Sequence, residues 1–308
     1  MKKIQIAVAT SFLLLLSSCF NDYDDNISVD DILIEDLPDN LFVDNNDNVY
    51  FTGNLDCNNG NYTVYPDNLI NVTISNSLPT SFDLSPFLPP IGNQGNQGSC
   101  TSWATTYYLK SFQERIESGL EYNQDRIMSP SYTYNQITQG ACGGTSFQST
   151  LEILKNKGAI SISEFPYFDF TCSIQPTMLQ NNLAAPNKIS DYKYLSGENM
   201  VLEMKSLIHN QTPILISAFL TKEFGKTDNF GLTAYREHTV YPDTKGGCHA
   251  MLVVGYSDSY NAFKVVNSWG ESWGDDGFVW IDYNAFNDIL NPNKSFKVIN
   301  QAIVVFDL

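Results

Sequence analysis

Hydrophobic residues follow different spacings in the earlier and later parts of the chain. Before residue 190 they recur at helical spacing, first from Trp103 through Tyr107 and Phe112 to Ile116, and again from residue 147 to residue 154. After residue 190, apolar runs bounded by Gly, Asn and Asp are typical of buried strands. The elements expected there are one helix, Met200–His209, and strands over 213–219, 250–256, 263–266, 278–283 and 302–306. The pattern predicts an α+β fold.

Three other stretches carry weaker patterns. Residues 79–90 lie between prolines and predict an extended path, and residues 221–247, rich in Gly, Thr and Asp, predict a long loop. Alternating apolar residues at 49–51 and 62–65 predict a little strand structure on both sides of Cys57. We expect this small strand region to pack against the main body of the protein.

The first residues have the pattern of an export signal. Two lysines are followed by an apolar stretch that ends at Leu16 and is too short to span a membrane, so residues 1–18 predict a secretory signal peptide. Small residues directly before Cys19 resemble a bacterial lipoprotein cleavage site, which would leave Cys19 as a lipidated N-terminus. The alternative is an ordinary signal peptide with Cys19 lost or free. We expect an exported, outer-membrane lipoprotein, attached to the membrane only through this lipid. Exposure at the cell surface is a further hypothesis.

Negative charge is concentrated near the N-terminus. Residues 20–87 hold 13 Asp and Glu side chains and no Lys or Arg, whereas the formal net charge of the whole chain is −17. Residues 88–308 therefore carry only −6. Such acidity argues against a nucleic-acid partner, because phosphates repel carboxylates. We interpret residues 19–77 as an acidic, self-repelling tether or a short pro-segment.

Cys100 lies at the start of the first helical pattern, three residues before Trp103. The free backbone amides and positive dipole end of a helix N-terminus favour a thiolate over a thiol. An isolated cysteine is more often a small buried hydrophobe. The residues downstream reverse that preference here.

A histidine and an asparagine flank two neighbouring predicted strands. His249 stands at the entrance of the apolar run 250–256, and Asn267 follows the strand 263–266, with Trp269 close behind it. If the two strands are adjacent in the sheet, the imidazole and the amide meet. Cys, His and Asn together are suited to nucleophilic catalysis, with the histidine as base and the amide as its orienting group.

These motifs resemble those of papain-type cysteine peptidases. Gln94, Cys100, His249 and Asn267 occur in the order of that family, and Asn-Ser-Trp-Gly at 267–270 is followed by Trp-Gly at 273–274. The separation of 149 residues between Cys100 and His249 lies at the upper end of the family's range of about 130 to 150. The order of four motifs is specific, although each alone is weak.

The resemblance implies a fold and a division of the chain. A papain-like protein has two domains, a helical left domain and a β-barrel-like right domain, with the active-site cleft between them. Residues 78–308 would form this peptidase domain, with the left lobe at about 88–190 and the right lobe at about 191–308. Residues 78–83 resemble the usual start of the mature enzyme, and cleavage there would remove the lipid.

The resemblance also implies a role for each site residue. Cys100 would attack the scissile carbonyl, His249 would take and later return the proton, and Asn267 would orient the imidazole. Gln94 and the Cys100 backbone N–H would bind the oxyanion, and Trp269 would shield the His–Asn pair from water. Gly143 and Gly144 resemble the glycine pair that binds substrate backbone, although an ordinary turn explains them nearly as well.

The cysteines depart from the family pattern. Gln97 and Ala141 stand where the family has a disulfide pair, and Thr101 replaces the usual aromatic residue after the nucleophile. Cys142 and Cys172 lie where the family carries a cysteine-bearing loop, so we expect these two to pair. Cys57 and Cys248 remain, and the sequence leaves open whether they form a bridge or stay as two free thiols.

The function expected from these residues is that of an exported cysteine endopeptidase acting on proteins or peptides through a Cys100 thiolate. A peptide ligase, an exopeptidase or a non-catalytic surface binding module on the same scaffold are the alternatives. No Cys/His spacing suits zinc, so we expect no metal and no cofactor, and we expect a monomer. No apolar strand follows His238, and His209 is expected at the end of the helix Met200–His209, so neither is expected to act as the base.

Overall fold

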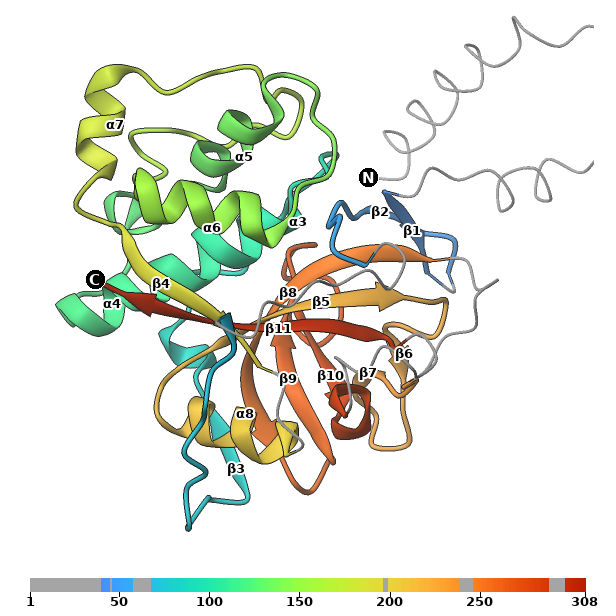
Figure 1. Cartoon of the computed structure of the whole chain (residues 1–308). Coiled ribbons are helices and arrows are strands. Elements are labelled where there is room, and N and C mark those ends of the chain that lie inside the picture. Colours follow the sequence, from blue (N-terminus) through green and yellow to red (C-terminus); the bar gives the residue numbers. More distant parts are fainter. Residues whose placement is uncertain (1–39, 45, 58–67, 196–198, 239–245, 288–296) are drawn as a thin grey trace, which may run out of the picture. The chain divides into compact units, whose positions relative to one another are not determined.

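The computed structural model describes residues 40–44, 46–57, 68–195, 199–238, 246–287 and 297–308, all within one compact unit (Figure 1). The predicted signal peptide, the lipidation site Cys19 and the predicted strand at 62–65 lie outside these residues. Among the described residues, no helix is both long and apolar enough to cross a membrane.

The helical run that begins at Cys100 has three parts. An α-helical turn, α3 (Cys100–Ser102), leads into a π-helical stretch, η3 (Trp103–Lys110), and then into α4 (Ser111–Ser118), which ends where Gly119 adopts a left-handed conformation at φ 67°. Trp103, Tyr107 and Phe112 are buried as the spacing predicted, whereas Ile116 at the end is 39% exposed. π-Helical turns often occur at functional sites, and this one begins three residues after the candidate nucleophile.

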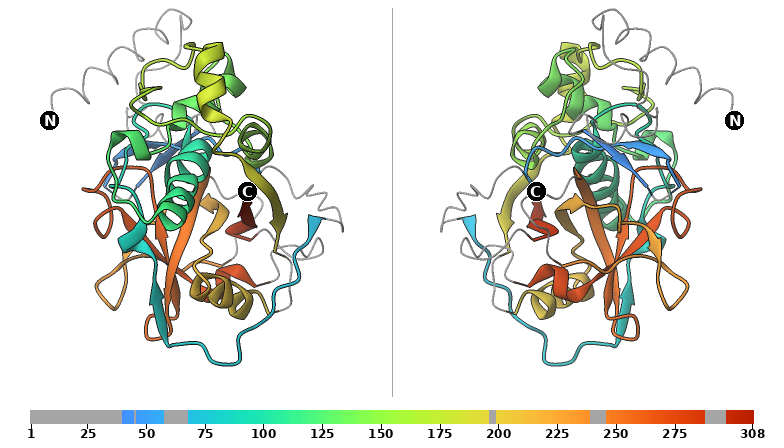
Figure 2. Two further views of the ribbon diagram at one scale, coloured as in Figure 1. Left: turned by 90° about the vertical axis from the view of Figure 1, so that its left-hand side faces the viewer. Right: turned by 90° about the vertical axis from the view of Figure 1, so that its right-hand side faces the viewer.

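Further helices and turns surround this run. The second apolar pattern forms α6, and its residues Phe147, Leu151 and Leu154 are fully buried. Ser146 and Ser149 form a capping box at the N-terminus of α6. The other elements of this side are η4 (Gln124–Arg126), α5 (Pro130–Thr138), α6 (Phe147–Asn156) and α7 (Met178–Ala184). In Figures 1 and 2, α5, α6 and α7 lie at the opposite end of the body from α8 (Met200–His209).

A nine-stranded sheet dominates the later half. Its strands follow the order β4-β11-β5-β8-β9-β10-β7-β6, with β3 added to β8. The end strands β4 and β6 do not pair with each other, so the sheet does not close into the expected β-barrel-like form. The strands are β3 (Ser81–Asp83), β4 (Ile189–Tyr194), β5 (Ile214–Leu220), β6 (Lys226–Thr227), β7 (Thr233–Tyr235), β8 (Gly247–Ser257), β9 (Ala262–Val266), β10 (Phe278–Asp282) and β11 (Ile299–Asp307).

Most elements expected after residue 190 are present. The helix α8 has the predicted bounds Met200–His209, and the five predicted strands correspond to β5, β8, β9, β10 and β11. The short helix η5 (Tyr283–Phe286) follows β10. The expected loop at 221–247 was wrong in part, because β6 and β7 lie inside it and β7 pairs in parallel with β10. Strand β4 was not predicted.

The stretches before the first helix are more ordered than expected. Residues 79–90 contain β3 and the 3-10 helix η2 (Ser85–Phe87) in place of a fully extended path. Upstream, β1 (Leu41–Val43) and β2 (Val49–Phe51) form an antiparallel hairpin. Phe42 of this hairpin is only 4% exposed because it packs into the main core, so the N-terminal region does pack against the body as expected.

Candidate active site

Cys100 is placed by the contact between α3 and β8. It is the first residue of the helical run and is completely buried. The backbone N–H groups of Ala250 and Thr101 hydrogen-bond its sulfur. Because Ala250 directly follows His249, the contact brings the thiol beside the predicted base.

The antiparallel pairing of β8 with β9 joins the predicted histidine and asparagine. His249 Nε2 lies 2.8 Å from Asn267 Oδ1, so the amide oxygen accepts from a ring N–H at this nitrogen. Asn267 Oδ1 also accepts from the backbone N–H of Ser268 at 2.7 Å, which fixes the amide. His249 Nδ1 is buried and has no partner among the described residues, so it is the nitrogen left to exchange a proton.

Burial keeps the thiol and the imidazole uncharged in this state. It raises the pKa of Cys100 to about 12, although hydrogen bonds from Ala250 and Thr101 oppose the shift. It lowers the pKa of His249 to about 4, against the opposing hydrogen bond with Asn267. Near neutral pH the site therefore holds a thiol and a neutral imidazole, and not the ion pair that a reactive thiolate requires.

Gln94 is anchored to the sheet although it precedes the helical run in sequence. Its side-chain Oε1 accepts from Ser268 Oγ at 2.6 Å, and its backbone N–H donates to Ser268 O at 2.8 Å. With the oxygen held, Nε2 donates to Gln97 O at 2.9 Å and to Phe51 O at 3.0 Å. The amide nitrogen is thus an oriented donor for a carbonyl oxygen.

The described residues of 40–57, called the covering segment below, run across this site. Phe51 O accepts from both Gln94 Nε2 and Trp269 Nε1, each at 3.0 Å. The next residue, Thr52, is completely buried. The backbone N–H groups of Gly53 and Asn54 then donate to Cys248 O at 3.2 and 3.1 Å. A peptide of the chain itself therefore occupies the space beside the candidate catalytic residues.

The covering segment also pairs with the loop that carries the predicted glycine pair. Thr145 N donates to Gly53 O at 2.7 Å, and Leu55 N donates to Thr145 O at 3.0 Å. A Cβ on Gly144 would lie 2.7 Å from Gly53 O, so only glycine permits this approach. A Cβ on Gly143 would meet nothing within 4 Å. Of the two glycines, Gly144 is the one at which lack of a side chain matters for the bound peptide.

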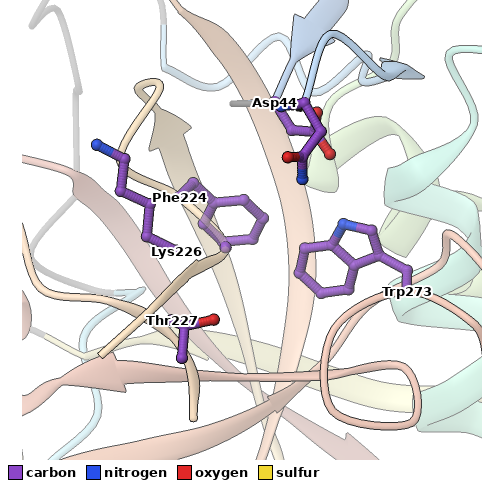
Figure 3. Close-up of a pocket in the computed structure, with 7 residues that line it drawn as sticks. Asp44, Phe224, Lys226, Thr227 and Trp273 are labelled. Carbon is purple, nitrogen blue, oxygen red and sulfur yellow. Dashed lines mark hydrogen bonds between the residues drawn. The ribbon is translucent and has the colours of Figure 1, made fainter. Parts of the chain in front are cut away.

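Aromatic side chains hold the start of the covering segment. Trp269 stacks on the His249 ring with centroids 4.6 Å apart, on Tyr50 at 4.5 Å and on Phe42 at 5.6 Å. Beside this stack, a cavity of about 190 Å³ remains between the hairpin and the body (Figure 3). Its lining residues are Asp44, Asn46, Phe224, Gly225, Lys226, Thr227 and Trp273.

The described residues contain two disulfides. Cys142 bonds to Cys172, the expected pair, and Cys57 bonds to Cys248, the pair that the sequence left open. Cys100 is a free thiol. The second bond joins the covering segment to the residue that precedes His249.

Several supporting residues escaped the sequence reasoning. Gln97, at the position of the absent family cysteine, donates from Nε2 to Phe168 O at 3.0 Å and so ties the start of the helical run to the loop that carries Phe168. Thr101 Oγ1 donates to Thr145 O at 3.1 Å, which fixes the loop paired with the covering segment. Ser268 positions Gln94. For Ser268, the sequence feature that could have indicated this role is its place directly after Asn267 in the Asn-Ser-Trp-Gly motif.

The two remaining histidines and one cluster of three acidic residues lie outside this arrangement. His238 Nε2 is 3.2 Å from Asp282 Oδ1, and His209 packs edge-on against Phe82. In the described part of the chain, Glu114, Glu117 and Asp307 are close enough to share an ion. Lys110 Nζ already pairs with Glu114 and Asp307, so this trio is explained as an ion-pair network.

Comparison with known proteins agrees with this geometry. The family model described as papain family cysteine protease matches residues 78–296. Among curated proteins, the chain is 29% identical over 199 residues to pro-cathepsin H of Mus musculus, covering 63% of this chain and 56% of that protein. It is 29% identical over 210 residues to gamete and mating-type specific protein A of Dictyostelium discoideum, covering 68% and 43%. The chain thus spans about half the length of these relatives.

Solved structures show the same fold. Xylellain, a cysteine protease from Xylella fastidiosa, superposes with a TM-score of 0.65 at 20% identity, covering 83% of this chain and 96% of that one. Digestive procathepsin L 3 from the larval midgut of Tenebrio molitor gives a TM-score of 0.58 at 20% identity, covering 79% and 75%. These similarities support the papain-like α+β architecture.

Proposed function

The chain belongs to the papain family of cysteine proteases, and from this membership we propose that it is a cysteine endopeptidase that hydrolyses peptide bonds through Cys100. The covered site is then a latent form. When the covering segment leaves, water and substrate reach the thiol and imidazole, and the pKa values of Cys100 and His249 return toward a range in which a thiolate–imidazolium pair forms.

Cys100 and His249 perform the proton and acyl transfers in this proposal. The Cys100 sulfur attacks the substrate carbonyl carbon, and His249 Nδ1 carries the proton that the leaving amine receives. The hydrogen bond from His249 Nε2 to Asn267 Oδ1 keeps Nδ1 directed at the thiol. Water, activated by the same imidazole, then hydrolyses the acyl-enzyme and restores Cys100.

The observation that carries the proposal is the peptide carbonyl of Phe51 at Gln94 Nε2. A substrate carbonyl in that position would have Gln94 and the Cys100 backbone N–H as donors for the negative charge that develops on its oxygen. The pairing of Gly53 and Leu55 with Thr145 supports a binding mode in which an extended peptide adds to the loop beside Gly144. Both features favour a peptide substrate.

We also propose an exported protein. Two disulfides favour an oxidising compartment outside the cytoplasm. In that case Cys19 carries the lipid that anchors the acidic tether to an outer membrane. The mass of the mature N-terminal peptide tests this: diacylated Cys19 supports the anchor, and an unmodified N-terminus overturns it.

The activity is tested on protein from which the covering segment has been removed, with internally quenched peptides and mass analysis of the products. We expect cleavage of internal bonds by the wild-type enzyme and none by Cys100→Ala. Ser173→Ala, at an exposed position, serves as the matched control and is expected to remain fully active. Release of terminal residues alone would indicate an exopeptidase. No hydrolysis by the uncovered wild-type protein would identify a binding module.

A further inference from the structure

The covering segment is attached to the body at two covalent points. One is the peptide chain that continues after Cys57, and the other is the disulfide from Cys57 to Cys248. A chain cut that separates residues 40–57 from the body falls on the C-terminal side of Cys57. Such a cut leaves the fragment bonded to Cys248, immediately beside His249.

We propose that the Cys57–Cys248 disulfide is a redox latch, so that the peptidase is uncovered only when the chain is cut after Cys57 and the disulfide is also reduced. The inference rests on the proposed function and concerns the regulation of the same site. Cutting alone leaves the covalent bond, and reduction alone leaves the segment tethered through the chain at a high effective concentration.

The surroundings of the latch support its use in thiol–disulfide exchange. Ser217 Oγ lies 3.3 Å from Cys57 Sγ and 3.5 Å from Cys248 Sγ. Asn300 Nδ2 donates to Cys57 Sγ at 3.4 Å, and the Cys57 backbone N–H donates to Cys248 Sγ at 3.1 Å. Hydrogen-bond donors beside both sulfurs stabilise the thiolate that leaves during exchange, whichever sulfur is attacked.

The reductant is a dithiol. One of its thiolates attacks a sulfur of the latch, forms a mixed disulfide and expels the other sulfur as a thiolate, which takes up a proton. The second thiolate of the reductant then closes its own disulfide and releases the remaining cysteine. Two electrons pass from the dithiol to the latch. Cys57 and Cys248 are 6% and 7% exposed, so exchange requires local opening and the latch stays closed in an oxidising medium.

The disulfide retains the cut fragment covalently, which the aromatic and hydrogen-bond contacts do not. Those contacts hold the fragment reversibly, so a fragment without the disulfide dissociates and is diluted, whereas a bonded fragment rebinds. Phe51 and Thr52 lie six and five residues before Cys57, so a fragment held at Cys57 cannot move far from the site.

The test uses the full chain, folded under oxidising conditions, with a thrombin recognition sequence inserted after Gly60. Thrombin cleaves after a basic residue, and residues 58–67 contain no Lys or Arg, so within this stretch the protease can cut only at the insert. The protein is held in four states: intact or cut, each with and without dithiothreitol. Intact mass then reports whether the fragment has left, and the rate of Cys100 modification by an epoxysuccinyl inhibitor reports whether the site is open.

We expect the cut and reduced state to lose the fragment and to react about 100-fold faster than each of the other three. The variant Cys57→Ser/Cys248→Ser is expected to lose the fragment after cutting alone. Cys142→Ser/Cys172→Ser, which keeps the latch, should still need the dithiol. Loss of the fragment from cut, unreduced wild-type protein would overturn the latch. This four-state measurement on the wild-type cysteines stands even if a variant fails to fold.

The same measurement separates the latch from the proposed peptidase activity. Fragment release depends only on the chain cut and the disulfide. If the fragment leaves only in the cut and reduced state but that protein neither reacts with the inhibitor nor hydrolyses peptides, the latch holds and the proposed activity fails. If hydrolysis appears without reduction, the activity holds and the latch fails.

Discussion

The two sides of the site hold their functional groups by different means. The helical side, formed by α3, η3 and the loop 143–147, presents Cys100 through one continuous stretch of chain. The sheet side, formed by β8 and β9 with residues 267–269, presents His249 and Asn267 through the register of two paired strands. A shift of one residue in that register would turn these side chains to the other face of the sheet. The helical side depends on local structure and the sheet side on long-range pairing.

Gln94 connects the two sides. It lies six residues before Cys100 in sequence, but Ser268 of the sheet side holds both its backbone and its side-chain amide. The covering segment likewise touches both, with Phe51 at Trp269 and Asp56 at the N-terminus of α6, where Phe147 N donates to Asp56 Oδ2 at 2.8 Å. Substitutions on the helical side or the sheet side are therefore expected to act locally, and substitutions in Gln94 or the covering segment are expected to affect both sides.

The largest expected effect comes from removing either member of the Cys100–His249 pair. Groups that act as one catalytic unit are strongly non-additive, so Cys100→Ala and His249→Ala should each lower kcat by about 10⁴-fold or more. The double variant should be no slower than the slower single variant. The measurement is kcat on a peptide substrate with the uncovered enzyme. A double variant slower by the product of the two effects would show that the two sides act independently.

Gln94→Ala should have the next largest effect. Loss of one preorganised oxyanion donor costs about 10²- to 10³-fold in kcat and leaves KM nearly unchanged, because the charge develops only in the transition state. Steady-state kinetics of the uncovered enzyme separate the two parameters. Gln97→Ala, which removes a side-chain bond to Phe168 O on the helical side only, is the control and should keep kcat within a few-fold. A rise in KM with unchanged kcat would show that Gln94 does not stabilise the oxyanion.

The same division explains what the sequence could predict. The helix at Cys100, α6, α8 and five strands follow from local hydrophobic spacing, and the helix α8 was predicted to the residue. The motif order then indicated that β8 and β9 are neighbours. These features are encoded by residues close together in the chain, so a single sequence is enough to find them.

Features that depend on distant contacts were missed or, for the Cys57–Cys248 disulfide, left open. Strand β4 joins the sheet only through β11, more than 100 residues away, and its sequence has no distinct strand pattern. The path of the covering segment depends on contacts of Tyr50 and Phe51 with Trp269, and its disulfide spans 191 residues. Neither spacing nor composition reports such pairings. The sheet likewise proved open because closure depends on its two end strands.

The smallest expected effect is a pH dependence that distinguishes the two sides. Burial raises the pKa of Asp56, the covering-segment residue that contacts the helical side, from 3.8 to about 6, against a hydrogen bond from Phe147. This carboxyl therefore favours the covered state below pH 3.8, and its contribution is lost as the pH rises through about 6. On the sheet side, burial lowers the pKa of His249 from 6.5 to about 4, so its contribution to covering is present above 6.5 and lost as the pH falls toward 4.

These two contributions have opposite sign over nearly the same pH range, so covering transfers a proton from His249 to Asp56 and leaves the wild-type segment almost insensitive to pH. Asp56→Asn removes the contribution of Asp56 and leaves that of His249. In a Cys100→Ala background, where the thiol does not titrate, the cut and reduced Asp56→Asn protein should release its fragment about tenfold faster at pH 5 than at pH 7. Asp47→Asn, an exposed position in the same segment, is the matched control and should behave as wild type. The release rate is followed by intact mass after rapid gel filtration. Equal pH profiles for Asp56→Asn and Asp47→Asn would show that covering moves no proton between the two sides.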